Sequence, residues 1–530
     1  MGRTGRSRRG ATLLALALLV AACTQAGEPT ASTTTAAPEG PLDGGSLRLG
    51  LPGPVVADPL LANPGSPADM MVLDILHDGL TALDEDGTPG PALARRWQRD
   101  ETGTRWTFEL DPDATFTSGE PVTVGDVSRS LSRLAAAGSQ SLAGVRLEAI
   151  AGYDAVAAGE AEILTGIREV DGSLEIELTR PLASLPALLA APPLGIVDVD
   201  GLEGSTSLAS LDLTGDWAVV DAGAAAAVLR GRDDRDAARH LDELVLVPHE
   251  DAAAAHDARE AGAVDWALVP AGVDGAGATG SLLDAPFHAE VFLGLRVDTA
   301  PLDRREVREA IAAAIDRDAV AEEVYDGFAV PLPSVVPAGV PGHDPGRCRG
   351  VACTHDPEAA RAHLRAATGD EALAPIGIDV DDTPLQVALG ELLVDQLEAA
   401  GIASELRVHG TEEYVALLTS GSPQVFSLGW VGVQASPEAY LEPLFRSASL
   451  DNLTRLRSEP IDELLGAAAT AEDPSEAWAD IESRVLGSAV VVPLVQFEIR
   501  AIVGERVRGL EHRVDGSVDW SGVWVTDAAA

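Results

Sequence analysis

Strand-like and helix-like segments alternate along almost the whole chain from Ser46 onwards. Residues 105–110 (RWTFEL) and 173–178 (SLEIEL) alternate apolar and polar side chains with the period of two that a half-buried strand requires. Residues 302–325 instead place apolar side chains at helical spacing, with charged side chains on the remaining face. This mixture excludes all-helical and all-strand folds and predicts a mixed α/β protein.

The same patterns predict further elements on both sides of these segments. Strands are expected at 46–52, 241–248, 403–408, 425–430 and 490–496, and helices at 73–80, 124–137, 185–191, 251–261 and 385–400. No internal repeat of fixed period interrupts the series. The chain of 530 residues is therefore expected to form several domains around a large core rather than a repeat array.

The first residues indicate the compartment. Residues 1–10 contain four arginines and no acidic side chain, and residues 11–22 form an apolar run that ends in small side chains. This order is typical of a secretory signal peptide, and the run is too short to cross a bilayer. We expect an exported chain, and Ser7-Arg8-Arg9 leaves the choice between the general secretory and twin-arginine routes open.

Residues 20–23 (VAAC) resemble the lipobox of bacterial lipoproteins, in which the cysteine becomes the lipidated first residue. Cys23 is thus the predicted anchor, and residues 1–23 the signal peptide; an ordinary cleaved signal with a chance cysteine is the alternative. Residues 24–45 are rich in Thr, Ala, Pro and Gly, a composition typical of a flexible tether. The expected location is the outer face of the cell membrane, with the lipid as the sole attachment to the membrane.

The net charge of −47 limits the partners. Nucleic acids require basic surface to neutralise their phosphates, so a nucleic-acid-binding function is excluded. An acidic exterior mainly controls solubility and association rates, and it does not by itself identify a cationic ligand.

Cys348 and Cys353 are the two cysteines besides the predicted anchor, and in an exported chain a disulfide is expected between them. His343 and His355 flank the pair, but oxidised cysteines cannot ligate zinc as thiolates and the spacing fits no standard zinc pattern. Residues 275–280 satisfy Gly-x-Gly-x-x-Gly without a clear helix after them, which indicates a loop. We expect neither a metal nor a cofactor.

Several segments, in order, resemble the extracytoplasmic solute-binding proteins of peptide and nickel ABC transporters, family 5. The matching segments are 73–97 (LDILHDGLTALDEDGTPGPALARRW), 106–127 (WTFELDPDATFTSGEPVTVGDV), 262–269, 301–327, 355–367, and Gly429-Trp430 with Pro437. In the first segment the resemblance implies a helix at Pro91-Ala92-Leu93-Ala94 that ends near Trp97.

The resemblance implies a two-lobed fold of the periplasmic-binding-protein type (type II, cluster C) with an additional inserted domain. The expected division is lobe I from residues 46–72, 205–285 and 500–530, the inserted domain from 73–204, and lobe II from 286–499. Closure around a ligand is then expected to be a hinge motion that excludes water.

The resemblance also implies a ligand site. Trp430, Val431, Gly432, Val433 and Ser436 are its predicted ligand-binding residues. Peptide-binding members commonly carry an aspartate at the position of Val433, where it pairs with the free amino terminus of the ligand. Because a buried ammonium group without a partner is unfavourable, either the ligand lacks a free α-amine or another acid supplies the charge.

The expected function is that of a monomeric binding protein without enzymatic activity. It would capture a small organic ligand, an oligopeptide or a related solute, in a cleft between lobes and deliver it to an ABC permease. Two alternatives remain open at this point. One is a surface module that senses or presents a ligand without transport, and the other is an exported hydrolase with a catalytic carboxylate pair.

Overall fold

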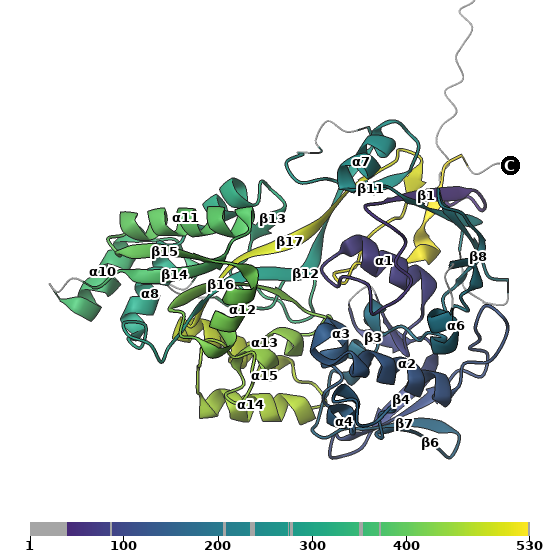
Figure 1. Cartoon of the computed structure of the whole chain (residues 1–530), viewed down its shortest axis with the longest axis horizontal. Helices are drawn as coiled ribbons and strands as arrows, with labels where there is room; N and C mark the ends of the chain where they lie inside the picture. Colours follow the sequence, from purple (N-terminus) through teal and green to yellow (C-terminus); the bar gives the residue numbers. More distant parts are fainter. Residues whose placement is uncertain are drawn as a thin grey trace, which may run out of the picture. The chain divides into compact units, whose positions relative to one another are not determined.

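The computed structural model describes residues 40–84, 87–204, 208–233, 239–273, 275, 279–348, 353–369 and 373–527 (Figure 1). The predicted signal peptide, Cys23 and residues 24–39 of the predicted tether lie outside these ranges. Within them, no helix combines the length and the apolar character needed to cross a lipid bilayer. Contacts join the chain from Gly40 onwards into one compact unit.

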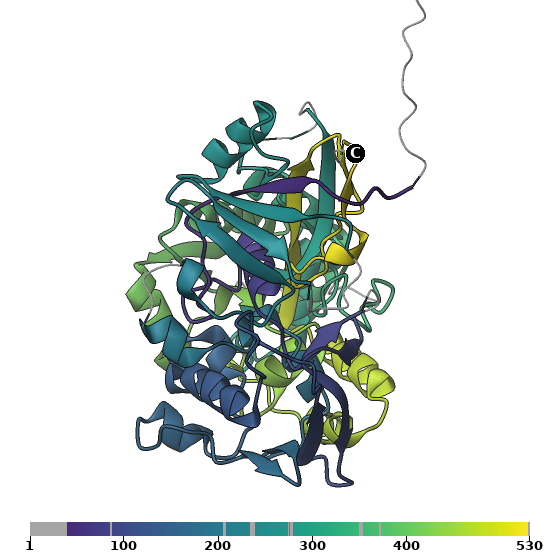
Figure 2. The ribbon, with the colours of Figure 1, turned by 90° about the vertical axis from the view of Figure 1, so that its right-hand side faces the viewer.

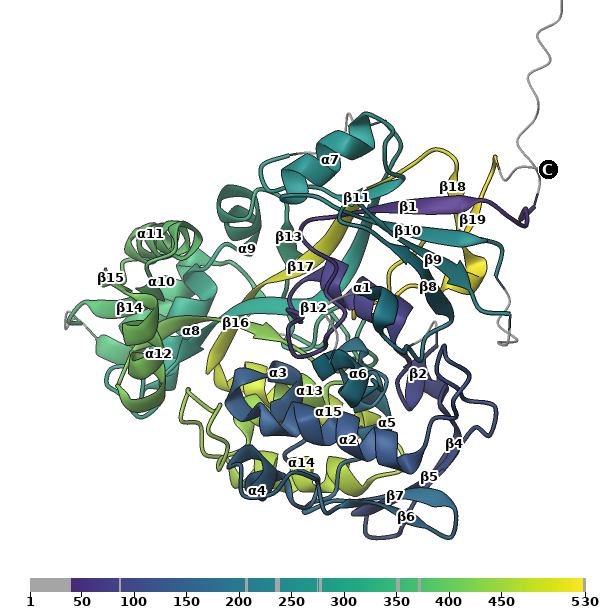
Figure 3. The same ribbon diagram turned by 45° about the vertical axis from the view of Figure 1, so that its right-hand side comes forward.

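Among the described residues, eleven strands form one large sheet (Figures 1 and 3). These strands are β1 (Ser46–Leu51), β8 (Trp217–Ala222), β9 (Ala227–Gly231), β10 (Glu243–Pro248), β11 (Trp266–Leu268), β12 (Ser281–Leu295), β13 (Ala329–Pro331), β14 (Ile376–Asp381), β15 (Ser404–His409), β16 (Val425–Val431) and β17 (Val491–Val503). Their order is β15-β14-β16-β12-β17-β11-β1-β10-β9-β8, with β13 paired to β17 beside this path.

The sheet brings together strands that are far apart in the sequence. β1 pairs in parallel with β10 and β11, and Figure 2 shows the purple β1 beside the teal strands from the middle of the chain. Leu47 and Trp266 are fully buried in a first core that also contains Val503 and Val525. The beginning, the middle and the end of the described chain therefore share one core.

β12 and β17, of 15 and 13 residues, run antiparallel to each other. At one end Val503 belongs to the first core, and at the other end Val492 belongs to a second core. The pairing of the two strands is interrupted between Pro286 and Glu290. Two long strands thus connect two separately packed cores, and their irregular stretch lies between those cores.

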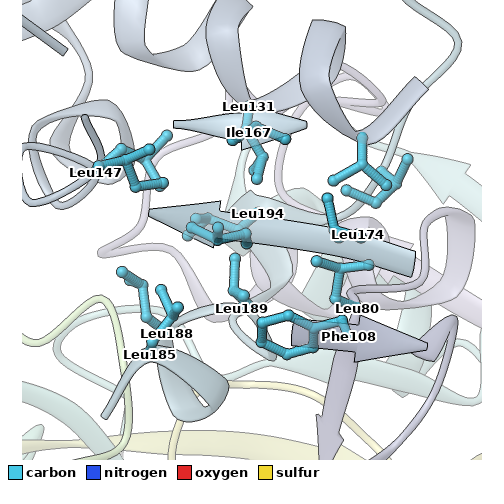
Figure 4. Close-up of a cluster of buried hydrophobic side chains, with 14 of the residues drawn as sticks. Leu80, Phe108, Leu131, Leu147, Ile167, Leu174, Leu185, Leu188, Leu189 and Leu194 are labelled. Atoms are coloured by element: carbon cyan, nitrogen blue, oxygen red, sulfur yellow. The ribbon is translucent and has the colours of Figure 1, made fainter. Parts of the chain in front are cut away.

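A third core is formed by residues between 80 and 196 together with Val433. Its sheet has the order β4-β5-β7-β6 and consists of β4 (Ala94–Arg99), β5 (Arg105–Leu110), β6 (Ile167–Val170) and β7 (Ser173–Glu177). The helix α2 (Val124–Ala136) begins at a capping box between Thr123 and Asp126. Its Leu131 belongs to the same core as Phe108 and Leu174 of the sheet (Figure 4). Apolar side chains from one helix face and one sheet face therefore close this core.

The remaining helices pack on these sheets or form a fourth core. They are α1 (Pro67–Leu76), α3 (Leu142–Val145), α4 (Tyr153–Ala157), α5 (Leu185–Leu188), α6 (Val199–Gly204), α7 (Ala252–Glu260), α8 (Arg305–Ala314), α9 (Arg317–Ala319), α10 (Pro357–Thr368), α11 (Pro384–Ala399), α12 (Thr411–Ser420), α13 (Glu438–Phe445), α14 (Glu459–Thr470) and α15 (Ser475–Ser488). Tyr440, Leu465 and Ile481 bring α13, α14 and α15 together in the fourth core. In Figures 1 and 3, α2 and α3 of the third core lie beside the helices α13, α14 and α15 of the fourth core.

Two expected helices are corrected. Residues 91–94 form no helix, because the chain there runs through β3 (Pro89–Pro91), which pairs with β2 (Thr81–Leu83), into β4, which pairs with β5. Pairing with neighbouring strands overrides the helix propensity of Ala and Leu. The helical pattern of residues 302–325 is broken at Ile315, which is extended and fully buried, and Asp316 caps the next turn.

The helix expected at 73–80 begins earlier and ends earlier, as α1 over Pro67–Leu76. Ser66 accepts a hydrogen bond from the amide of Asp69, and Pro67 occupies the first helical position, which together set this start. The predicted boundary between lobe I and the inserted domain, at residues 72 and 73, falls within α1. The division into lobes remains a prediction.

Candidate functional site

The segment predicted to bind the ligand links β16 to α13 and is fixed to β12. The amide of Gly432 and the hydroxyl of Tyr440 both donate hydrogen bonds to the carbonyl of His288, each at 2.9 Å. Val431 pairs with Ala289 of the same strand. A Cβ atom at position 432 would overlap the Tyr440 hydroxyl, so only glycine allows this close approach. The segment is therefore attached to the strand that connects the cores.

Trp430 joins β16 to the region of the third core. Its Nε1 donates to the carbonyl of Ala439 at 2.9 Å, and the guanidinium carbon of Arg146 lies 5.0 Å from the indole centroid. Burial lowers the pKa of Arg146, although the negative charges of Asp451, Glu148 and Glu442 oppose this change. The polar group of the indole and one of its faces thus contact protein rather than an open cavity.

Val433 is buried in the third core, with 1% of its surface exposed. This contact attaches the segment after β16 to residues 80–196. An aspartate at position 433 would place a carboxylate among apolar side chains, where its ionised form is strongly disfavoured. The apolar side chain at this position therefore has a packing role in the structure.

A cavity of about 520 Å³ adjoins the same segment at residues 435–438. Its other walls come from residues 87–89, from β4 and β5, from residues 183–187, from residues 336–347 and from the chain around the start of α15. It therefore lies between the elements of the third core and those of the fourth core. Of the five predicted ligand-binding residues, Ser436 lines this cavity, and Trp430, Val431, Gly432 and Val433 do not.

Three tryptophans form apolar walls of the cavity: Trp97 on β4, Trp106 on β5 and Trp478 on α15. Trp106 and Trp478 are each only 6% exposed. Two of them lie on adjacent antiparallel strands, and the third comes from a helix more than 350 residues further along the sequence. Sequence reasoning missed this set because no local spacing connects its members.

The two arginines that line the cavity are engaged by protein groups. Arg99 donates to the carbonyls of Thr470 and Ala471, at 3.2 and 3.1 Å, at the end of α14. The Nε atom of Arg347 lies 3.0 Å from a carboxylate oxygen of Glu482. These contacts give both arginines structural roles. Arg347 also balances the charge of Glu482.

Glu482 is itself held by the loop that precedes Arg347. Its other carboxylate oxygen accepts hydrogen bonds from the Ser334 hydroxyl at 2.6 Å and from the amides of Val335 and Val336 at 2.9 and 3.0 Å. These three donors satisfy one carboxylate oxygen of a side chain that is buried.

Glu438 differs from Glu482 in its surroundings. It is the first residue of α13 and is 4% exposed, and neither of its carboxylate oxygens forms a well-directed hydrogen bond with a described residue. Burial raises the pKa of Glu438 to about 7; Glu442 adds to this rise, while Ser184 and Arg180 act against it. This carboxyl group therefore changes charge near neutral pH.

Cys348 and Cys353 form a disulfide bond, as expected. His343 donates from Nδ1 to the carbonyl of Val336 at 2.7 Å, and His355 lies 3.2 Å from a carboxylate oxygen of Asp316, so the two histidines have separate partners. Within the ranges that the structure describes, no group of three or more potential metal ligands occurs. Part of the glycine-rich segment 275–280 lies outside those ranges.

The mixed α/β fold, with two long strands between separate cores and a tryptophan-lined cavity, defines a solute-binding protein of the periplasmic-binding-protein type. The model of the family "Bacterial extracellular solute-binding proteins, family 5 Middle" matches residues 88–452. The chain belongs to this family, whose members bind solutes and are not enzymes.

Relatives match over very different lengths. The oligopeptide-binding protein OppA of Bacillus subtilis is 21% identical over 86% of this chain and 89% of its own length, and the heme-binding protein A of Haemophilus influenzae is 22% identical over 94% and 95%. The probable di/tripeptide-binding protein 5 of Pseudomonas aeruginosa is 28% identical over 45% of this chain. That last match covers 46% of the Pseudomonas protein, less than half of its length.

Solved structures show the same fold. The unliganded open form of the periplasmic murein tripeptide binding protein MppA superposes with a TM-score of 0.79 at 20% identity, over 92% of this chain and 99% of that one. HbpA2 from Haemophilus parasuis gives a TM-score of 0.75 at 20% identity, over 91% and 100%. These similarities confirm the predicted cluster C fold.

Proposed function

We propose that this chain is the lipid-anchored solute-binding component of an ABC importer. In this proposal Cys23 carries the lipid at the outer face of the cell membrane, and residues 24–45 form the tether. The monomeric body captures a small organic ligand, an oligopeptide or a related solute, and passes it to a permease. The names of the relatives, which bind oligopeptides, heme or a murein tripeptide, support a role in the capture of organic solutes.

The observation that carries the proposal is the connection of two cores by β12 and β17. Strands that cross between lobes are suited to hinge closure, because a few residues can absorb the change in backbone angles while both cores stay packed. The interrupted pairing between Pro286 and Glu290 supports a hinge in this stretch. The segment after β16 is hydrogen-bonded to His288 in the same stretch, so closure would displace a wall of the cavity.

The test is native mass spectrometry of the full chain purified from its own host. We expect one small molecule bound per chain, released when the protein unfolds, and acyl groups on the peptide that contains Cys23. A chain that carries no molecule, even after incubation with spent culture medium, would contradict solute capture. An unmodified Cys23 would contradict the anchor alone.

Transport is tested separately with the recovered molecule. A host strain without this chain is expected to lose uptake of the isotope-labelled solute, and a plasmid copy is expected to restore it. Unchanged uptake together with intact binding would assign the chain to ligand sensing or presentation. Chemical conversion of the solute by the purified chain would indicate a hydrolase.

A further inference from the structure

The cavity combines flat apolar walls with an excess of acidic groups. Trp97, Trp106 and Trp478 supply the aromatic surfaces. Aromatic rings present a negative electrostatic potential at their faces, which attracts cations as well as apolar groups. The volume of about 520 Å³ is in the range of cavities that enclose small organic ligands.

The ionisable side chains that line the cavity are Arg99, Arg347, Glu438, Glu472 and Glu482. Arg99 binds carbonyls at the end of α14, and Arg347 pairs with Glu482. Glu472 is exposed at the rim. Among these described residues, Glu438 alone is both buried and without a well-directed hydrogen bond.

The ionised form of a buried carboxyl group of this kind becomes favourable when a cation lies beside it. The hydroxyl and amide of Ser184 and the charge of Arg180 favour the ionised form of Glu438. Ser184 carries no positive charge, and Arg180 also lies 2.9 Å from Glu148 and 3.6 Å from Glu442. Glu442 itself disfavours ionisation of Glu438. The protein therefore compensates the negative charge of ionised Glu438 only in part. A cationic group of a ligand would supply the remaining positive charge.

We infer that the cavity binds an organic amine, with the ammonium group at Glu438 and an apolar or aromatic body between the tryptophans. This inference rests on the proposed capture of a solute and names the class of that solute. Both oxygens of Glu438 are shielded from solvent, so contact with the ligand requires a change in the rotamer of this side chain. The acid lies five residues after Val433, on the opposite end of the same connecting segment.

Isothermal titration calorimetry of the purified full chain with matched amines and alcohols tests the inference. The probes are tryptamine and phenethylamine, each paired with its alcohol, tryptophol or 2-phenylethanol, at pH 8. At least one amine is expected to bind ten times more tightly or better than its alcohol. Equal affinities within each pair, or no binding of either amine, would overturn the assignment.

Glu438→Gln removes the charge and keeps the size of the side chain. It is expected to lower amine affinity at least tenfold and to change alcohol affinity less than twofold. Glu476→Gln is the matched control, because it removes the same charge at an exposed position of α15 that does not line the cavity, and it is expected to leave both affinities within twofold. An unchanged amine affinity in Glu438→Gln, or an equal loss in the control, would refute the role of Glu438.

Glu438→Asp keeps the charge on a shorter side chain and is expected to retain a preference for the amine over its alcohol. Loss of that preference in Glu438→Asp, with unchanged thermal unfolding, would also contradict the inference. The outcome is separable from that of the proposed function. A neutral solute recovered from the host chain, with no amine binding, would exclude the amine and leave solute capture intact.

Discussion

The buried carboxyl group of Glu438 gives the folded chain a specific dependence of stability on pH. Its pKa is about 7 in the folded state against an ordinary value of 4.5. The folded chain thus holds this proton more tightly than the unfolded chain does. Stability is therefore expected to fall as pH rises through the window from 4.5 to 7, because ionisation is easier in the unfolded state.

The magnitude follows from the two pKa values. One pKa unit corresponds to about 1.4 kcal/mol, so the shift from 4.5 to about 7 removes roughly 3 kcal/mol of stability between pH 4.5 and pH 8. Glutamine at this position cannot ionise and avoids the loss. The free energy of unfolding of Glu438→Gln, relative to that of the parent chain, is therefore expected to be roughly 3 kcal/mol higher at pH 8 than at pH 4.5.

Urea unfolding of both chains at pH 4.5 and pH 8, followed by circular dichroism, measures this difference. Other groups that titrate in the same range, such as Asp74, whose pKa burial raises to about 7, contribute equally to both chains. Glu472→Gln at the exposed rim serves as the control and is expected to show no comparable gain. A Glu438→Gln effect that is equal at the two pH values, or that becomes destabilising at pH 8, would refute the reasoning.

Three further predictions concern other parts of the chain. Gly432→Ala is expected to destabilise the fold by about 1–3 kcal/mol in urea unfolding, because its Cβ overlaps the Tyr440 hydroxyl; Gly466→Ala, with open space in α14, is its control and should be neutral or stabilising. Trp430→Phe removes the hydrogen bond to a carbonyl of α13 and is expected to cost about 1 kcal/mol in the same assay. Cys23→Ser is expected to shift the protein from the membrane fraction to the culture medium, and retention at the membrane would contradict the lipid anchor.

Strands with clean alternation were predictable from the sequence. RWTFEL at 105–110 and SLEIEL at 173–178 form β5 and β7, because each alternates between a buried face and a more exposed face. The helix that the family resemblance implied at Pro91-Ala92-Leu93-Ala94 is wrong, since the conformation of this segment is set by pairing with β2 and β5. The break at Ile315 likewise depends on tertiary burial and on the cap at Asp316.

The candidate site was predictable only in part. The sequence directed attention to the segment after β16, and Ser436 of that segment lines the cavity. Glu438 stands two residues further on, but it is one of 84 acidic residues and becomes distinctive only through burial without a hydrogen bond. Trp97 and Trp478 meet at the cavity because the third and fourth cores pack together, and long-range packing leaves no spacing signal in the sequence.

In the proposed function, the two cores joined by β12 and β17 close on a captured solute. Small-angle X-ray scattering of the chain before and after addition of its co-purified solute tests this most directly. Hinge closure predicts a smaller radius of gyration in the saturated sample, with one solute bound per chain. An identical scattering curve at full saturation would contradict the hinged capture of a solute.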